Sequence, residues 1–253
     1  MTRNVRRIQL TPAYILHHRP YRDTSRILEV IAREHGRLSL FARGVRGPKA
    51  KLASALQPFQ LLLLSWSGRG EAAQLTGAES ADQGSPLPAE SLMAAFYLNE
   101  LLMKLTTRHD PLPVVFDHYH ATVESLRRGL PLEPALRVFE KRLLEALGYG
   151  LDLAFEAQTG KPVEAGGYYH FRPAQGLFPT VAEAAGALAG RSVLNLAQER
   201  LEGGRDLEDS RRLLQAALGQ CLEGRELTTR LVARSIHGLR PRSNEARAKP
   251  RTS

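Results

Sequence analysis

The residues with the clearest capacity for chemistry are the cations of one short loop, which reads ARGVRGPKAK from residue 42 to residue 51. Arg43, Arg46, Lys49 and Lys51 are separated there by two glycines and a proline, so their side chains can reach successive phosphates. The loop lacks the Gly-Lys-Ser/Thr ending of a nucleotide-binding P-loop. We therefore interpret it as a contact for a nucleic-acid backbone, and not as an ATPase site.

Positive charge is concentrated in the first 51 residues. They contain ten arginines and two lysines against three acids, a net charge of +9 that equals the net charge of all 253 residues. The rest of the chain is therefore neutral overall. A basic module joined to a neutral body is the pattern expected of a polyanion-binding domain fused to an interaction platform.

Five short segments around this loop are expected to form strands. They cover residues 14–18, 25–33, 37–43, 56–66 and 71–78, with turn residues between them and an irregular basic leader over 1–11. Five such strands favour a small closed barrel, because closure removes exposed edges. The predicted fold class is α+β, with an N-terminal five-stranded OB-fold barrel over residues 1–80, ahead of an all-α helical domain.

The segment 37–43 alternates most clearly. Its apolar residues Leu38, Leu40 and Ala42 are predicted to point inward, which leaves the other face basic and aromatic. Bases of single strands stack on aromatic rings beside cations. The predicted DNA contacts are accordingly Arg37, Phe41, Arg43, Arg46, Lys49 and Lys51. A second interpretation stays open: the local aromatic residues instead fill the barrel, namely Tyr14, Tyr21, Phe41, Phe59 and Trp66.

A linker is predicted over residues 81–90, followed by a helical domain over 91–237. Apolar residues with a period of 3.6 predict its helices, the second of them capped by Asp110. The expected helices cover residues 88–107, 111–126, 133–147, 180–189, 192–202, 206–222 and 226–237. An irregular insert or hairpin is expected at about 150–180, and a basic, disordered tail over 238–253.

Several classes of site are excluded by what the sequence lacks. It has no G-x-S-x-G or H-E-x-x-H motif, and its single cysteine, Cys221, is expected in the core. His118 and His120 stand two apart on a predicted helix, so they point away from each other and cannot share a metal. We expect no metal, no cofactor and no enzymatic activity. No long apolar run is present, so a cytoplasmic protein without a membrane partner is expected.

Cations on the predicted helix 133–147 suggest a second kind of site. Arg137 and Lys141 could capture an acidic, apolar peptide tail. Pairing with Glu133, Glu140 and Glu145 along the same helix explains these charges equally well. Both interpretations stay open on residue pattern alone.

An ordered set of motifs resembles the RecO DNA repair family over roughly residues 10–237. In the N-terminal part they are YRDTSRIL (21–28), GRL (36–38), ARGVR (42–46), ALQPF (55–59) and GRGE (68–71). In the helical part they are YLNELL (97–102), PALRVFE (134–140), LGYG (147–150) and GREL (224–227).

The resemblance implies a recombination mediator rather than an enzyme. Such a protein binds single- and double-stranded DNA through its barrel and anneals complementary strands without a nucleotide. It also implies binding to the C-terminal tail of the single-stranded-DNA-binding protein, and joint action with RecR that loads RecA, in the cytoplasm at the nucleoid. Arg137, within the PALR motif, would contact the tail. The four-cysteine zinc module of many members is missing here. The alternative function is an OB-fold RNA-binding or ribosome-associated factor.

Overall fold

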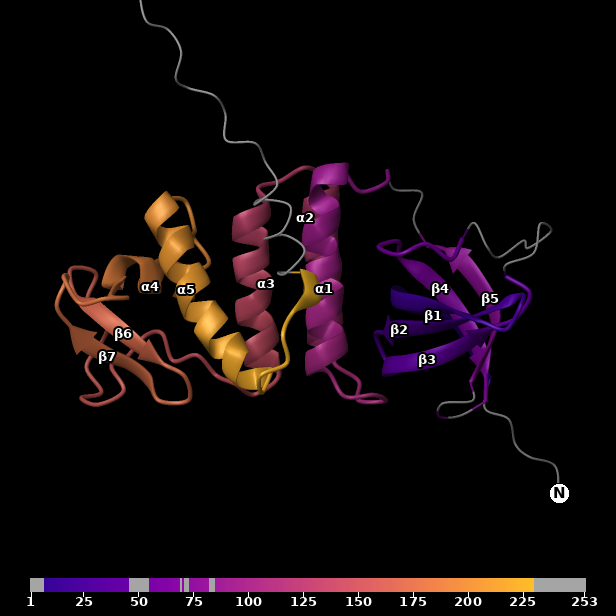
Figure 1. The fold of residues 1–253 in the computed structure, drawn as a ribbon, viewed down its shortest axis with the longest axis horizontal. Coiled ribbons are helices and arrows are strands. Elements are labelled where there is room, and N and C mark those ends of the chain that lie inside the picture. Colours follow the sequence, from indigo (N-terminus) through magenta and orange to yellow (C-terminus); the bar gives the residue numbers. More distant parts are fainter. Residues whose placement is uncertain (1–6, 46–54, 69, 71–72, 82–84, 230–253) are drawn as a thin grey trace, which may run out of the picture.

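The computed structural model describes residues 7–45, 55–68, 70, 73–81 and 85–229. Figure 1 shows a row of three parts, with a β-barrel at one end, a group of helices in the middle and a small sheet at the other end. Within the described residues, no helix is long and apolar enough to cross a membrane.

The barrel confirms the predicted fold class. Its five strands are β1 (Arg7–Tyr21), β2 (Ser25–Ala32), β3 (Gly36–Ala42), β4 (Leu62–Ser67) and β5 (Gln74–Ser80). They close in the order β1-β2-β3-β5-β4, with one parallel contact between β3 and β5. Leu38, Leu40 and Ala42 point into the barrel core, as their alternation predicts.

Strand β1 is longer than the sequence suggests. It begins at Arg7, inside the expected irregular leader, and continues through Pro20. Its first half pairs with β4 and its second half with β2, so Pro12 and Pro20 each lie where a single strand pairs with β1. A proline is tolerated in a strand where its missing N–H faces no partner.

The helical part is built on α1 (Leu92–Leu105), α2 (Pro113–Arg127) and α3 (Leu132–Ala146), which follow a short 3-10 turn, η2 (Ala89–Ser91). The three-helix arrangement is as predicted, but Asp110 does not cap α2. The N-cap position is Leu112, without a side-chain hydrogen bond, and Pro113 occupies the first turn. Proline suits that position because the N–H it lacks would have no partner in the helix.

Of the two alternatives predicted for the insert, the structure contains the hairpin, and a third strand extends it to a small sheet. Strands β6 (Tyr168–Arg172) and β7 (Gly176–Thr180) form a hairpin, and β8 (Leu188–Ala189) pairs with β6. The helix predicted over 180–189 is wrong, because residues 181–187 form turns that lead into β8. No group of three or more metal-ligating side chains occurs among the described residues.

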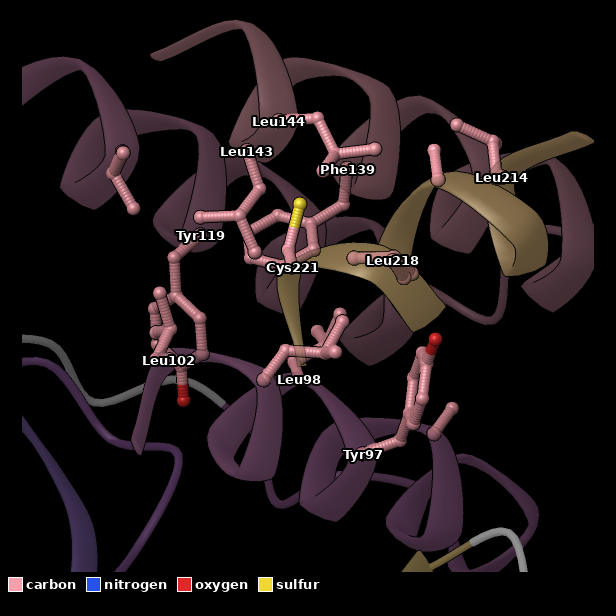
Figure 2. Close-up of a cluster of buried hydrophobic side chains, with 14 of the residues drawn as sticks. Tyr97, Leu98, Leu102, Tyr119, Phe139, Leu143, Leu144, Leu214, Leu218 and Cys221 are labelled. Atoms are coloured by element: carbon pink, nitrogen blue, oxygen red, sulfur yellow. The ribbon is translucent and has the colours of Figure 1, made fainter. Parts of the chain in front are cut away.

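Two further helices, α4 (Gly190–Ala197) and α5 (Gly204–Cys221), pack beside the insert. Figure 2 shows α5 contributing Leu214, Leu218 and Cys221 to the core formed with α1, α2 and α3. Burial raises the pKa of the Cys221 thiol, and its predicted core position is confirmed. Beyond Thr229, the helix predicted over 226–237 lies outside the described residues, as does the tail 238–253.

The same core also includes side chains from the barrel. Tyr14, Leu16 and Ile31 point out of the barrel and join the helical cluster. The Asn99 side chain of α1 donates a hydrogen bond to the Leu16 carbonyl (2.8 Å) and accepts one from the Tyr119 hydroxyl (2.6 Å). Barrel and helices are therefore packed as one body.

Candidate nucleic-acid interface

An aromatic pair lies at one end of the barrel. Tyr21, the last residue of β1, is 38% exposed, and its ring meets Phe41 of β3 edge to face at 5.4 Å between centroids. The Arg22 guanidinium carbon lies 5.4 Å from the Tyr21 ring centroid. Rings beside guanidinium groups are the arrangement on which unpaired bases stack.

The cationic loop leaves the barrel beside this pair. Strand β3 ends at Ala42, and the exposed Arg43 follows Phe41 by two residues. Gly44 has a positive φ of 66° and turns the chain away from the strand. The other predicted contacts in the loop, Arg46, Lys49 and Lys51, lie outside the described residues.

The remaining aromatic residues of the barrel are structural. Trp66 is 4% exposed in the barrel core, whereas Tyr14 and Phe59 belong to the core shared with the helices. Each of the two interpretations therefore holds for some of the aromatic residues. Three residues fill cores, and Tyr21 and Phe41 remain at the surface as candidates for stacking.

Arg37 has a different environment from Arg43. Its guanidinium donates hydrogen bonds to the Thr106 carbonyl at 2.8 and 3.3 Å and pairs with Glu29 at 3.4 Å. Burial lowers the pKa of Arg37, an effect that the Glu29 carboxylate opposes. Arg37 thus ties the outer face of β3 to the chain after α1, and its predicted contact with DNA stays a prediction.

Glu29 is the centre of this contact between barrel and helical part. It accepts hydrogen bonds from Ser39 and from Arg108, the latter at 2.5 Å. Sequence periodicity indicates that residues 37, 39 and 41 face away from the barrel interior. It does not indicate that another segment covers the first two of them.

The predicted peptide contacts are engaged in ion pairs. Arg137 is 8% exposed and donates to Glu140 at 2.7 Å, while Lys141 pairs with Glu145 at 3.0 Å and Glu199 at 3.1 Å. The pairs along α3 that the sequence analysis considered are therefore present for Glu140 and Glu145. Capture of a peptide by Arg137 and Lys141 stays a prediction.

A groove between α2 and α3, which sequence reasoning missed, has a volume of about 560 Å³. Its lining is mostly apolar, with Arg142 and His118 as its basic members: His118, Ala121, Thr122, Ser125, Leu130, Pro131, Pro134, Ala135, Val138, Phe139, Arg142 and Leu201. Hydrogen bonds to Glu199 raise the pKa of Arg142, whereas burial lowers the pKa of His118. The sequence signal that could have indicated this groove is the pair of prolines at the start of α3, Pro131 and Pro134, which both line it.

The closed barrel with order β1-β2-β3-β5-β4, fused to a helical platform, places the chain in the class of OB-fold proteins with an added helical domain. Comparison with known families specifies this further. The family described as Recombination protein O N terminal matches residues 7–83, and the one described as Recombination protein O C terminal matches residues 89–235.

Curated relatives agree with both matches. The chain is 43% identical to the DNA repair protein RecO of Methylococcus capsulatus, over 90% of this chain and 94% of the relative. It is 42% identical to that of Nitrosococcus oceani (88% and 92% covered) and 39% identical to that of Ralstonia nicotianae (89% and 84%). The chain belongs to the RecO family.

Proposed function

We propose that this protein acts in DNA repair as a recombination mediator, which binds DNA through its barrel and anneals complementary single strands. The observation that carries the proposal is the pair of the exposed Tyr21 and the half-buried Phe41, with Arg22 over the Tyr21 ring and the cationic loop beginning at Arg43. The names of the relatives, DNA repair protein RecO, support the same process.

Annealing is consistent with this distribution of charge. Two phosphate backbones repel each other, and a net charge of +9 within the first 51 residues screens both. Stacking and phosphate contacts carry little base information, so base edges remain available for pairing and sequence preference is low. The reaction requires neither a nucleotide nor a metal.

Proposed partners come from the family resemblance. They are the C-terminal tail of the single-stranded-DNA-binding protein, and RecR, which together with this protein promotes RecA loading. The helical platform supports tail binding in two ways. The α2–α3 groove offers an apolar surface, and Arg142 beside it is 38% exposed at its side chain despite its pair with Glu199. Carboxylates of an acidic tail would compete with Glu199 for Arg142 and Lys141.

The test is annealing of complementary oligonucleotides coated with the cognate single-stranded-DNA-binding protein, in EDTA and without ATP. We expect acceleration by this protein, and loss of that acceleration when the coating protein lacks its C-terminal tail. Acceleration on naked strands alone would retain the DNA role and remove the tail site. Absence of annealing on both substrates, with tighter binding to RNA than to DNA of equal sequence, would favour the RNA-binding alternative.

Charge reversal assigns the site within the same assay. Changing Arg43, Arg46 and Lys49 to Glu is expected to abolish annealing and lower DNA affinity, with the salt slope reduced by about two units for three phosphate contacts. The control reverses three exposed arginines outside the barrel: Arg128, Arg200 and Arg211. Equal loss in both variants would mean that overall charge, and not the barrel loop, governs binding.

A further inference from the structure

We propose that the outer face of the sheet β7-β6-β8 is a second nucleic-acid surface, which binds single strands by stacking of bases. This sheet lies at the opposite end of the molecule from the barrel (Figure 1). The site is separate from the barrel site and goes beyond the proposed function, which requires one DNA surface only.

The strand register gathers the relevant side chains on one face. In β6, Tyr168, His170 and Arg172 alternate along that face, and Phe178 of β7 is directly opposite His170. The other face of the sheet is in the core, where Tyr169 is 2% exposed. An antiparallel sheet with one buried face leaves its second face at the surface.

Two arginines lie over rings on or beside this face. The Arg172 guanidinium carbon is 4.4 Å from the Phe178 ring centroid, and that of Arg205, from the first turn of α5, is 5.8 Å from the Tyr168 centroid. Both arginines are exposed. An exposed guanidinium beside a ring can itself stack on a nucleic-acid base, so each pair can hold one base.

The charges on this face fit a nucleic acid. Within the described residues, Arg172 has no carboxylate at salt-bridge distance, so its charge is available to a phosphate. The Arg205 side chain is 61% exposed and forms an ion pair with Asp209 at 3.6 Å. Only Arg172 carries a charge that no carboxylate of the described chain neutralises, because Arg205 is paired with Asp209. We therefore expect base stacking to contribute more to binding at this face than the release of counterions from phosphates. The ligand is therefore single-stranded, because a duplex hides its base faces.

Photocrosslinking of the full-length protein tests this site without any substitution. We use an oligodeoxynucleotide of about 20 residues that carries 5-iodouracil, which crosslinks to aromatic side chains that stack on it. Peptides that contain Tyr168 or Phe178 are expected among the crosslinked products, next to peptides from the barrel. Crosslinks to the barrel alone would overturn the second site and leave the proposed function intact.

Substitution then separates nucleic-acid binding from a structural role of the arginine–ring pairs. Arg172→Gln with Arg205→Gln is expected to lower the crosslink yield at Tyr168 and Phe178 by about fivefold or more, and to leave the barrel yield unchanged. The matched control is Arg128→Gln with Arg211→Gln. Circular dichroism verifies that both variants fold. An unchanged yield in the first variant would overturn the proposal.

Discussion

Gly36 shows how a single residue determines the fit between the barrel and the helical part. It has a φ of +66° at the turn between β2 and β3, and a Cβ atom placed there would lie 2.1 Å from the Asp110 carbonyl oxygen. Nearby, the His109 N–H donates to the Arg37 carbonyl at 2.8 Å. The chain after α1 therefore lies directly against the backbone of this turn, and a side chain would displace it.

We expect Gly36→Ala to destabilise the protein by more than the roughly 1–2 kcal/mol that a positive φ alone costs an alanine. Gly44→Ala is the matched control, because Gly44 has the same φ of 66° and a Cβ atom placed on it would meet no atom within 4 Å. Urea unfolding of the two variants gives the comparison. Equal losses of unfolding free energy would mean that the contact with Asp110 contributes nothing.

At the scale of elements, α1 fixes the chain that follows α5. The Glu100 carboxylate accepts hydrogen bonds from the N–H groups of Thr228 (2.8 Å) and Thr229 (2.9 Å) and from the Thr229 hydroxyl (2.7 Å). Burial alone would raise the pKa of Glu100, but these bonds lower it to about 2. An acid on α1 thus holds the backbone of Thr228 and Thr229, which are more than 120 residues away in the sequence.

This contact predicts a dependence of stability on acid. Because the pKa of Glu100 is lower in the folded chain than its ordinary value of 4.5, its contribution is complete above pH 4.5 and is lost as the pH falls toward 2. Glu100→Gln should lower the unfolding free energy at pH 7 by on the order of 2 kcal/mol and flatten the profile in that window. Glu208→Gln, at a largely exposed acid, is the control. Parallel profiles for wild type and Glu100→Gln would contradict the assignment.

At the scale of the whole molecule, the barrel and the helical part do not have independent cores. Tyr14 is fully buried against Phe116 and Tyr119 of α2, with ring centroids 5.7 and 5.0 Å apart, and its hydroxyl is 2.6 Å from His120 Nδ1. Arg33 adds a two-bond contact to Asp117, each bond 2.8 Å long, at the rim of the interface. Separation of the two parts would expose the apolar face of β1.

We therefore predict one cooperative thermal transition for the described parts of the chain. Differential scanning calorimetry should give a calorimetric enthalpy close to the van't Hoff enthalpy, since the buried interface prevents either part from unfolding alone. Arg33→Ala serves as the control, because an exposed ion pair contributes little to stability and its loss should leave a single transition. Two resolved transitions in the wild type would show that the interface is weak.

The sequence predicted those elements whose two faces differ in polarity. Alternation in β3 identified its inward residues, and the 3.6-residue period identified the buried side of α2, including Val115 and Tyr119. It could not predict contacts between elements. Arg37 and Lys141 follow patterns typical of surface cations, yet tertiary packing places Arg37 against the Thr106 carbonyl and Lys141 against Glu199. Periodicity describes one element at a time, and the partner of a polar face depends on the whole fold.

The shared core also determines how two ligands, one on the barrel and one on the helices, are positioned relative to each other. A flexible linker lets a second ligand explore a volume, so its effective concentration near the first falls as the linker lengthens. Here Leu16, Ile31 and Asn99 join the barrel to α1 without such freedom. A strand on the barrel and a partner on the helices would be held at a fixed separation and angle. The distance between the two bound ligands is then fixed by the fold. Substrates whose length matches this distance gain affinity by binding both sites, and longer or shorter substrates do not.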